Sequence, residues 1–231
     1  MQRRPKLVVF DLDETLGHFS QLGLLMQAVK ATAHRTMSIA EAIDIFPEVL
    51  RPGIPKMLVD LRDRKKNGEL IEVIIYTNNC GHPSWANSIA EALNAKLGYR
   101  LFVQVIPGYV GRGSCRTTMD KTVHDLHRCI PLPPLVDVCF VDDAHHPGMI
   151  NDSVYYIRLP PYYCPLTLDA MLDRCCTYYR VGPRARMFKR QMMKELNSYG
   201  GEWLTQTDRG STAYLNDIIF HNRLQIFLNR K

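Results

Sequence analysis

Five short apolar runs, bounded by charged or turn-forming residues, recur along the first 160 residues of the chain. They occupy residues 6–10, 70–76, 101–106, 135–141 and 153–159. Each run is rich in β-branched or aromatic residues and is shorter than a typical helix, which is the pattern of a buried strand. The sequence therefore predicts strands at these five places.

Helical patterns separate these runs. Apolar residues spaced by four predict a helix over residues 84–97, and similar patterns predict helices after Gly53 and around residues 119–129. Strands that alternate with helices form parallel sheets covered by helices on both faces. We therefore expect an α/β fold with a Rossmann-like parallel sheet.

Residues 17–50 are a long insertion between the first strand and the next helical unit. Ser38 and Glu41 have the spacing of a capping box, in which each side chain bonds the other residue's backbone amide, so a helix is expected to begin there. The insertion can hold one or two helices. We expect it to form a small cap or flap within a core domain of residues 1–175.

Residues 176–231 differ from the core in pattern and in charge. Two helices are expected here, over residues 186–198 and 212–228. The segment holds ten Lys/Arg and four Asp/Glu, and so accounts for the whole formal net charge of +6. A basic surface attracts acidic partners, so this helical C-terminal extension is either a nucleic-acid-binding element or simply a solvated face of terminal helices.

Composition narrows the class of protein. The chain has 231 residues, of which 46% are hydrophobic and 23% charged, as in ordinary globular proteins. No segment has the run of about 20 apolar residues that spans a bilayer, so no membrane partner is expected. Seven cysteines, an odd number without a Cys-x-x-Cys pair, favour an intracellular, reducing compartment, either cytoplasm or nucleus.

Polar residues follow three of the predicted strands directly. Asp11, Asp13 and Thr15 come after the first strand, residues 77–79 (Thr-Asn-Asn) after the second, and residues 142–143 (Asp-Asp) after the fourth. The carboxyl ends of parallel strands lie on one edge of a sheet, where ligands bind, so these groups can converge. Clustered carboxylates need a cation or a proton between them, which suits Mg²⁺ and an anionic substrate. An aspartate placed there can also accept a phosphoryl group.

These motifs resemble the haloacid dehalogenase superfamily of phosphohydrolases. Within that superfamily, Asp11-Leu12-Asp13-Glu14-Thr15-Leu16 is most similar to the phosphatases of the RNA polymerase II C-terminal domain and their NLI-interacting-factor-like relatives. Leu50-Arg51-Pro52-Gly53, followed by a helix and a strand into Thr77, is similar to that family too. The resemblance spans residues 6–160 and implies the fold of that superfamily, with a small cap.

The resemblance also implies a role for each matching residue. Asp11 would be the nucleophile, and Asp13 would be the general acid and then the general base. Thr77 and Asn78 would contact the phosphoryl group, although the family usually has Thr-Ala-Ser where this chain has Thr-Asn-Asn. Lys121, which lies 21 positions before Asp142, would neutralise phosphate charge.

The implied cofactor is Mg²⁺. Its ligands would come from Asp11, from the backbone carbonyl of Asp13, and from Asp142 and Asp143. The two histidines His124 and His127, with the nearby Cys129, suggest a competing zinc site, but no spacing in the sequence supplies a fourth ligand.

The implied activity is a Mg²⁺-dependent phosphatase that hydrolyses phosphomonoesters through an aspartyl-phosphate. A small cap leaves a site open, which favours phosphoserine or phosphothreonine in a protein. The same motifs permit a small-molecule or nucleic-acid-end phosphatase. A third interpretation is an interaction protein that keeps the fold without catalysis, against which the intact Asp11, Asp13, Thr77 and Asp142 argue.

Overall fold

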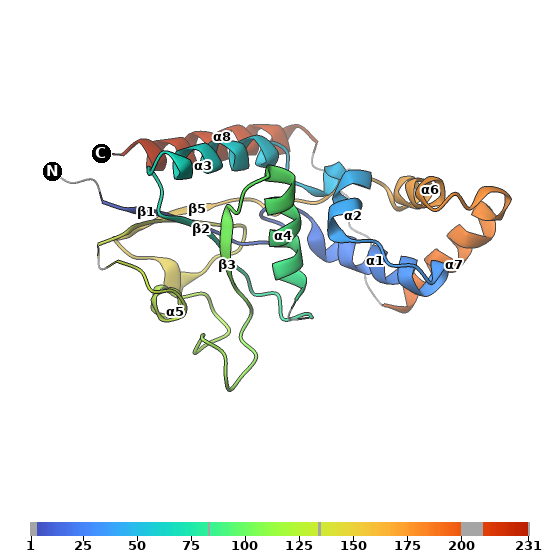
Figure 1. Cartoon of the computed structure of the whole chain (residues 1–231), viewed down its shortest axis with the longest axis horizontal. Helices are drawn as coiled ribbons and strands as arrows, with labels where there is room; N and C mark the ends of the chain where they lie inside the picture. Colours follow the sequence, from blue (N-terminus) through green and yellow to red (C-terminus); the bar gives the residue numbers. More distant parts are fainter. Residues whose placement is uncertain (1–3, 83, 134, 200–209, 231) are drawn as a thin grey trace.

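The computed structural model describes residues 4–82, 84–133, 135–199 and 210–230, with the side chains of residues 210–216 outside that description. In this part of the chain, parallel strands form one sheet in the order β3-β2-β1-β4-β5 (Figure 1). The strands are β1 (Lys6–Phe10), β2 (Glu72–Tyr76), β3 (Phe102–Ile106), β4 (Asp137–Asp142) and β5 (Val154–Arg158). All five predicted strands are confirmed, within two residues at either end.

Helices connect and cover the strands. They are α1 (Phe19–Ala33), α2 (Ile39–Ile45), α3 (Ile54–Lys66), α4 (Trp85–Leu97), α5 (Val123–Cys129), α6 (Leu168–Tyr178), α7 (Ala185–Ser198) and α8 (Gly210–Asn229). Short 3-10 turns lie at Pro47–Val49, Pro147–Met149 and Gly182–Arg184. The Ser38–Glu41 capping box starts α2 as predicted. No helix among the described residues is long and apolar enough to cross a membrane.

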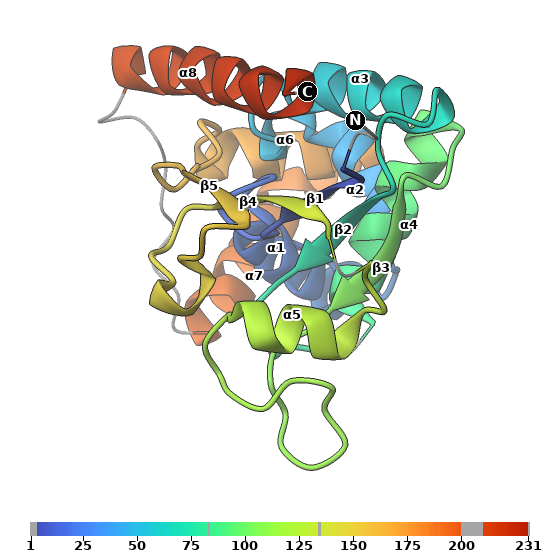
Figure 2. The ribbon, with the colours of Figure 1, turned by 90° about the vertical axis from the view of Figure 1, so that its left-hand side faces the viewer.

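The two faces of the sheet carry separate cores. Alternate residues of a strand point to opposite faces. Leu7 and Val9 pack with Leu126 of α5, whereas Val8 and Phe10 join the larger core formed with the other helices. Figure 2 shows α5 below the sheet and α3 and α8 above it. The predicted α/β fold, with helices on both faces, is confirmed.

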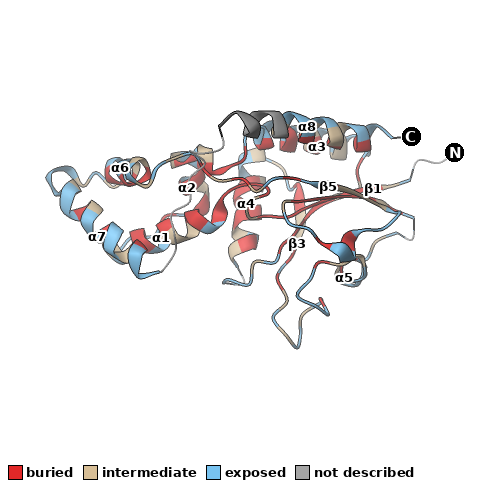
Figure 3. Cartoon of the chain, turned by 180° about the vertical axis from the view of Figure 1, so that it is seen from behind, coloured by how far each residue is buried: buried red, intermediate tan, exposed pale blue. Residues whose placement is uncertain are grey.

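A helical lobe lies to one side of the sheet. It consists of α1 and α2 from the 17–50 insertion together with α6 and α7 (Figure 1). α7 packs against both α1 and α6, and Arg174 of α6 makes a bidentate pair with Glu48, with N–O distances of 2.6 and 2.7 Å. Figure 3 shows buried residues where the lobe meets the sheet and exposed ones on its outer side. The boundary expected at residue 175 lies inside α6, so the insertion and the start of the extension share one lobe.

The last helix, α8, returns to the sheet and lies beside α3 (Figures 1 and 2). Phe227 stacks on Tyr155 of β5, with ring centroids 5.8 Å apart. Lys6 of β1 donates hydrogen bonds to the carbonyl oxygens of Leu228 and Arg230, at 2.5 and 2.7 Å. A cation at a helix C-terminus satisfies carbonyl groups that have no partner within the helix. The end of the basic segment is therefore an integral part of the core.

Two local expectations are corrected. The helix expected around residues 119–129 begins at Val123, with Thr122 as its N-cap, so Lys121 lies in the preceding loop. Cys115 and Cys129 form a disulfide, which was not expected from the number and spacing of the cysteines, since these favour a reducing compartment. This pair has no local sequence signal, because the two residues meet only when the loop folds back along α5.

The packing of α8 on the sheet is testable. Phe227 is 2% exposed and Ile226, its neighbour on the same helix, is 55% exposed. We expect Phe227→Ala to lower the free energy of unfolding by about 3–5 kcal/mol, and Ile226→Ala to change it by about 0.5 kcal/mol or less. Urea denaturation of the two variants measures the difference. Equal effects would contradict the position of α8.

Candidate active site

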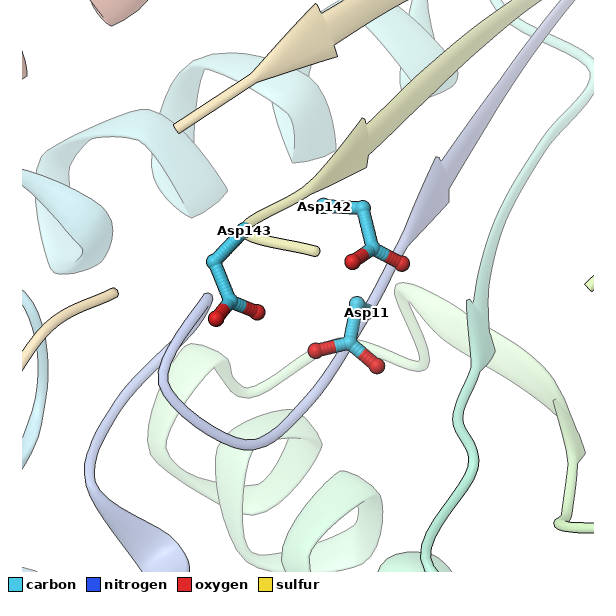
Figure 4. Close-up of side chains that lie close together, drawn as sticks. All are labelled: Asp11, Asp142 and Asp143. Carbon is cyan, nitrogen blue, oxygen red and sulfur yellow. The ribbon is translucent and has the colours of Figure 1, made fainter. Parts of the chain in front are cut away.

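Three carboxylates meet at the carboxyl edge of the sheet. β1 and β4 are neighbours in register, and the Asp11 amide donates to the carbonyl of Val141 at 2.9 Å, which places Asp11 beside Asp142. Oxygens of Asp11, Asp142 and Asp143 lie within 4.8 Å of one another. Figure 4 shows the three side chains gathered around one space. The convergence predicted from the strand ends is confirmed for these residues.

Lys121 enters this cluster from the loop before α5. Its Nζ donates to Asp11 Oδ1 and, at 2.6 Å, to Asp142 Oδ2. The side chain is 1% exposed and its ammonium lies 5.8 and 5.9 Å from the ring centres of Tyr76 and Phe140. Burial alone would lower the pKa of Lys121, but the charges of Asp11 and Asp142 and their hydrogen bonds raise it above its usual value. Lys121 is therefore a buried cation held between two carboxylates.

Burial and neighbouring charges set the protonation of the three carboxyl groups. Burial and the charge of Asp142 raise the pKa of Asp11 to about 7, although Lys121 opposes the shift. Burial would also raise the pKa of Asp142, but a hydrogen bond from His146 and the charge of Lys121 outweigh it and lower the pKa. Burial and the charge of Asp142 raise the pKa of Asp143.

Hydrogen bonds orient the second acidic pair. Thr15 Oγ1 donates to Asp143 Oδ1 at 3.1 Å and accepts from the Asp143 amide at 3.1 Å. The amide of Ala144 donates to Asp142 Oδ1 at 2.8 Å, and Nε2 of His146 lies 3.3 Å from Asp142 Oδ2. The two aspartates therefore have fixed side chains, which suits a preformed ligand set.

Asp13 is not one of the three carboxylates that cluster within 4.8 Å. Asn79 Nδ2 donates to Asp13 Oδ2 at 2.9 Å, while Asp13 Oδ1 is buried without a hydrogen-bond partner in the described part of the chain. Burial raises the pKa of Asp13, against the hydrogen bond from Asn79 and the charge of Lys121. A carboxyl group with one oxygen held by Asn79, one oxygen without a hydrogen-bond partner among the described residues, and a raised pKa is suited to hold a proton and release it.

The loop after β2 is fixed by an arginine that the sequence did not single out. Arg116 is 2% exposed. It donates to the carbonyls of Thr77 at 3.1 Å, Pro107 at 3.2 Å and Met119 at 2.6 Å. It also donates to Asn78 Oδ1 at 2.8 Å, so the Asn78 amide oxygen is engaged by Arg116. Arg116 therefore connects the Thr-Asn-Asn segment to the loop that carries Lys121.

Arg51 performs a similar function for the first motif. It donates to the carbonyls of Thr15 and Glu14, each at 2.8 Å, and to that of Pro160 at 2.7 Å. Its Nη1 lies 3.2 Å from Asp217 of α8. Glu14 has a φ of 58°, an unfavourable value for a residue with a side chain, so the turn needs external support. Arg51 supplies that support, a role that its place in the Leu50–Gly53 motif did not indicate.

The cluster fits a hard divalent cation. Its three carboxylates outnumber the one lysine, and carboxylate oxygens are the ligands that Mg²⁺ uses in proteins. Asp11, Asp142 and Asp143 would hold the ion. His124 and His127 do not belong to any cluster of metal-binding side chains among the described residues, and Cys129 is in the disulfide, so the zinc alternative finds no support.

A parallel Rossmann-like sheet with an Asp-x-Asp-x-Thr loop after its central strand, a buried lysine and an acidic pair is the arrangement of haloacid dehalogenase-type phosphatases. The family model of the NLI interacting factor-like phosphatases matches residues 6–182, and the chain belongs to this family. A comparison with curated proteins found no match. Helices α7 and α8 lie beyond the matched residues.

Metal binding by the cluster can be measured without substrate. We expect Mg²⁺ at about 100 times its dissociation constant to stabilise the wild type by about 2.7 kcal/mol, with a corresponding rise in melting temperature. Asp142→Asn removes one carboxylate of the cluster and should lose most of this rise, relative to its own melting temperature without metal. Asp152→Asn, a change of the same type at an exposed residue, should retain it. An undiminished rise in Asp142→Asn would place the metal elsewhere.

Proposed function

We propose that this protein is a Mg²⁺-dependent phosphatase that hydrolyses phosphoserine or phosphothreonine in a protein, through an aspartyl-phosphate on Asp11. The observation that supports this most is the buried contact of Lys121 with Asp11 and Asp142, next to Asp143. Phosphoryl transfer needs positioned positive charge more than any other contribution from the protein. Lys121 supplies one charge, and Mg²⁺ when bound would supply two more and polarise the phosphoryl oxygens.

In the first step a carboxylate oxygen of Asp11 attacks phosphorus. The bond between phosphorus and the substrate oxygen breaks as the bond to Asp11 forms, and Asp13 gives its proton to the departing serine or threonine oxygen. The raised pKa of Asp13 and its Oδ1, which has no hydrogen-bond partner among the described residues, are consistent with this role. Asn79 would keep the other oxygen of Asp13 in place.

In the second step water displaces Asp11 from phosphorus. Asp13, now ionised, takes a proton from the attacking water, and the bond between Asp11 and phosphorus breaks to release phosphate. Thr77, 1% exposed at the end of β2, and Asn78 beside it would contact the phosphoryl oxygens. Arg116 would act indirectly, by holding these two residues in position.

A macromolecular substrate is favoured by the packing of the insertion. α1 packs against α7, and α2 packs against α4, so both helices of residues 17–50 are engaged with the rest of the fold. Enzymes that act on small molecules often close a mobile lid over the substrate. Helices packed in this way are poorly suited to that movement, and a phosphorylated peptide segment needs no lid.

The test of the nucleophile is hydrolysis of para-nitrophenyl phosphate with and without Mg²⁺. Turnover should require Mg²⁺ and should fall by about a thousandfold or more in Asp11→Asn, which cannot form the intermediate. Asp152→Asn is the matched control and should retain full activity. Residual Mg²⁺-dependent turnover in Asp11→Asn at the wild-type rate would exclude Asp11. Folded wild-type protein that binds Mg²⁺ but hydrolyses neither this ester nor phosphopeptides would be an interaction protein.

The effect of replacing Asp13 should depend on the leaving group of the substrate. Asp13→Asn should slow hydrolysis of a phosphoserine peptide by about 10²–10⁴-fold, since a serine alkoxide needs a proton to depart. Nitrophenolate is a weak base and needs no such proton, so with para-nitrophenyl phosphate the second step should become slow and the phosphorylated enzyme should accumulate. Mass spectrometry after a rapid quench detects the added phosphoryl group. Equal slowing of both substrates, with no phosphorylated enzyme, would contradict a general acid at Asp13.

A further inference from the structure

A disulfide closes the segment that carries two side chains of the candidate active site. Cys115 lies in the loop between β3 and α5, and Cys129 is the last residue of α5. The two cysteines are 14 positions apart, and both Arg116 and Lys121 lie between them. The cross-link therefore restrains the backbone that positions both of these side chains.

The disulfide is accessible to solvent. Cys115 is exposed and Cys129 is half-buried, whereas Cys80 is the only exposed residue among the five free cysteines. Figure 2 shows the loop between β3 and α5 projecting past α5, away from the sheet. An exposed disulfide exchanges with dissolved thiols, and the number and spacing of the cysteines favour a reducing compartment, where dithiols are abundant.

Arg116 links the disulfide to the candidate active site. It follows Cys115 directly and is 2% exposed. Its side chain donates to the carbonyl of Thr77 at 3.1 Å and to that of Met119 at 2.6 Å. Met119 lies two positions before Lys121. A displacement of Cys115 from α5 would therefore disturb both the loop after β2 and the cation in the carboxylate cluster.

Hydrogen bonds also attach this loop to α5. Asp125, which is fully buried, accepts from the amides of Thr117 at 2.9 Å and Thr118 at 3.3 Å. Arg128 Nε donates to the carbonyl of Cys115 at 2.9 Å. Because these bonds do not depend on the disulfide, we expect its reduction to loosen the loop without unfolding it. A misplacement of about 1 Å can slow a reaction about a hundredfold, so a small loosening is sufficient to change the rate.

We propose that Cys115 and Cys129 form a thiol-sensitive switch. The disulfide holds Arg116 and Lys121 in the positions that catalysis needs, and its reduction releases them and lowers the activity. The inference rests on the proposed phosphatase function and adds its regulation.

The reductant is a dithiol, and the more exposed sulfur, that of Cys115, is the one attacked. A thiolate of the dithiol bonds to Cys115 Sγ as the bond to Cys129 Sγ breaks, and Cys129 leaves as a thiolate. The second thiolate of the reductant then attacks its own sulfur in this mixed disulfide and displaces the Cys115 thiolate. The two cysteines take up two protons and two electrons, and the dithiol becomes a disulfide. A small-molecule disulfide restores the Cys115–Cys129 bond by the reverse exchange.

The experiment compares oxidised full-length protein with protein reduced by dithiothreitol, in the presence of Mg²⁺ and a phosphoserine peptide. Reduction should lower kcat/KM by about tenfold, and reoxidation with oxidised glutathione should restore it. Cys115→Ser should stay at the lower value under both conditions. Cys80→Ser, the same change at an exposed cysteine outside the disulfide, should keep the full response to reduction.

Hydrogen exchange of backbone amides, measured by mass spectrometry, tests the loop without any turnover. Reduction should speed exchange over residues 115–122 by about tenfold or more, because the segment loses its covalent restraint. Exchange in α7, which is not attached to this loop, should stay unchanged. A local change of this kind distinguishes release of the loop from a general loss of stability.

The outcomes separate this inference from the proposed function. Equal kcat/KM in the oxidised and reduced forms of an active enzyme would overturn the switch alone. A response to dithiothreitol that persists in Cys115→Ser would assign it to another thiol and would also overturn the switch. Faster exchange over residues 115–122, in a protein without phosphatase activity in either form, would contradict the proposed function and support the release of this segment by reduction.

Discussion

The structure depends on one buried electrostatic arrangement, in which Lys121 lies between Asp11 and Asp142. Two buried carboxylates with no cation between them would repel each other and would each lose hydration, so the edge between β1 and β4 could not hold them both ionised. Lys121 allows both carboxylates to be buried at this edge. The loop that carries Lys121 is joined to the core by Arg116. An ammonium group that stabilises two carboxylates can also stabilise the negative charge of a phosphoryl group that lies on the solvent side of these carboxylates. The same interaction thus supports both the fold and the proposed chemistry.

The C-terminal extension contacts the segment that carries the first motif. Arg51 joins the backbone of Glu14 and Thr15 to Asp217 of α8, and Lys6 joins the start of β1 to the last carbonyls of that helix. α8 lies outside the residues that match the family model, yet it contacts both ends of the segment that carries the first motif. Five basic residues of the C-terminal extension lie on helices that pack on the fold: Arg186, Lys189, Arg190 and Lys194 on α7, and Arg223 on α8. Their charge does not in itself indicate a nucleic-acid ligand.

The sequence was sufficient to predict the elements that have a regular pattern of apolar and polar residues. Apolar runs located the strands, and their abrupt polar ends located Asp11, Asp142 and Asp143. Lys121 was found from the order of motifs, not from local pattern. Arg51 was noted only as part of the Leu50–Gly53 motif and Arg116 was not noted at all, because important partners of both lie far away in the chain. Arg51 contacts residues 36 and 166 positions away, and Arg116 contacts residues 38 and 39 positions away.

The proposed function requires that Asp11 accept the phosphoryl group within a Mg²⁺-loaded site. Fluoroberyllate binds an aspartate carboxylate as a phosphoryl group does, and fluorine NMR distinguishes its bound form from the free form. The measurement is made with Mg²⁺ and fluoroberyllate on the wild type and on Asp11→Asn. We expect a bound signal in the wild type that requires Mg²⁺ and is absent from Asp11→Asn. An identical bound signal in both proteins, or none in a wild type that binds Mg²⁺, would contradict it.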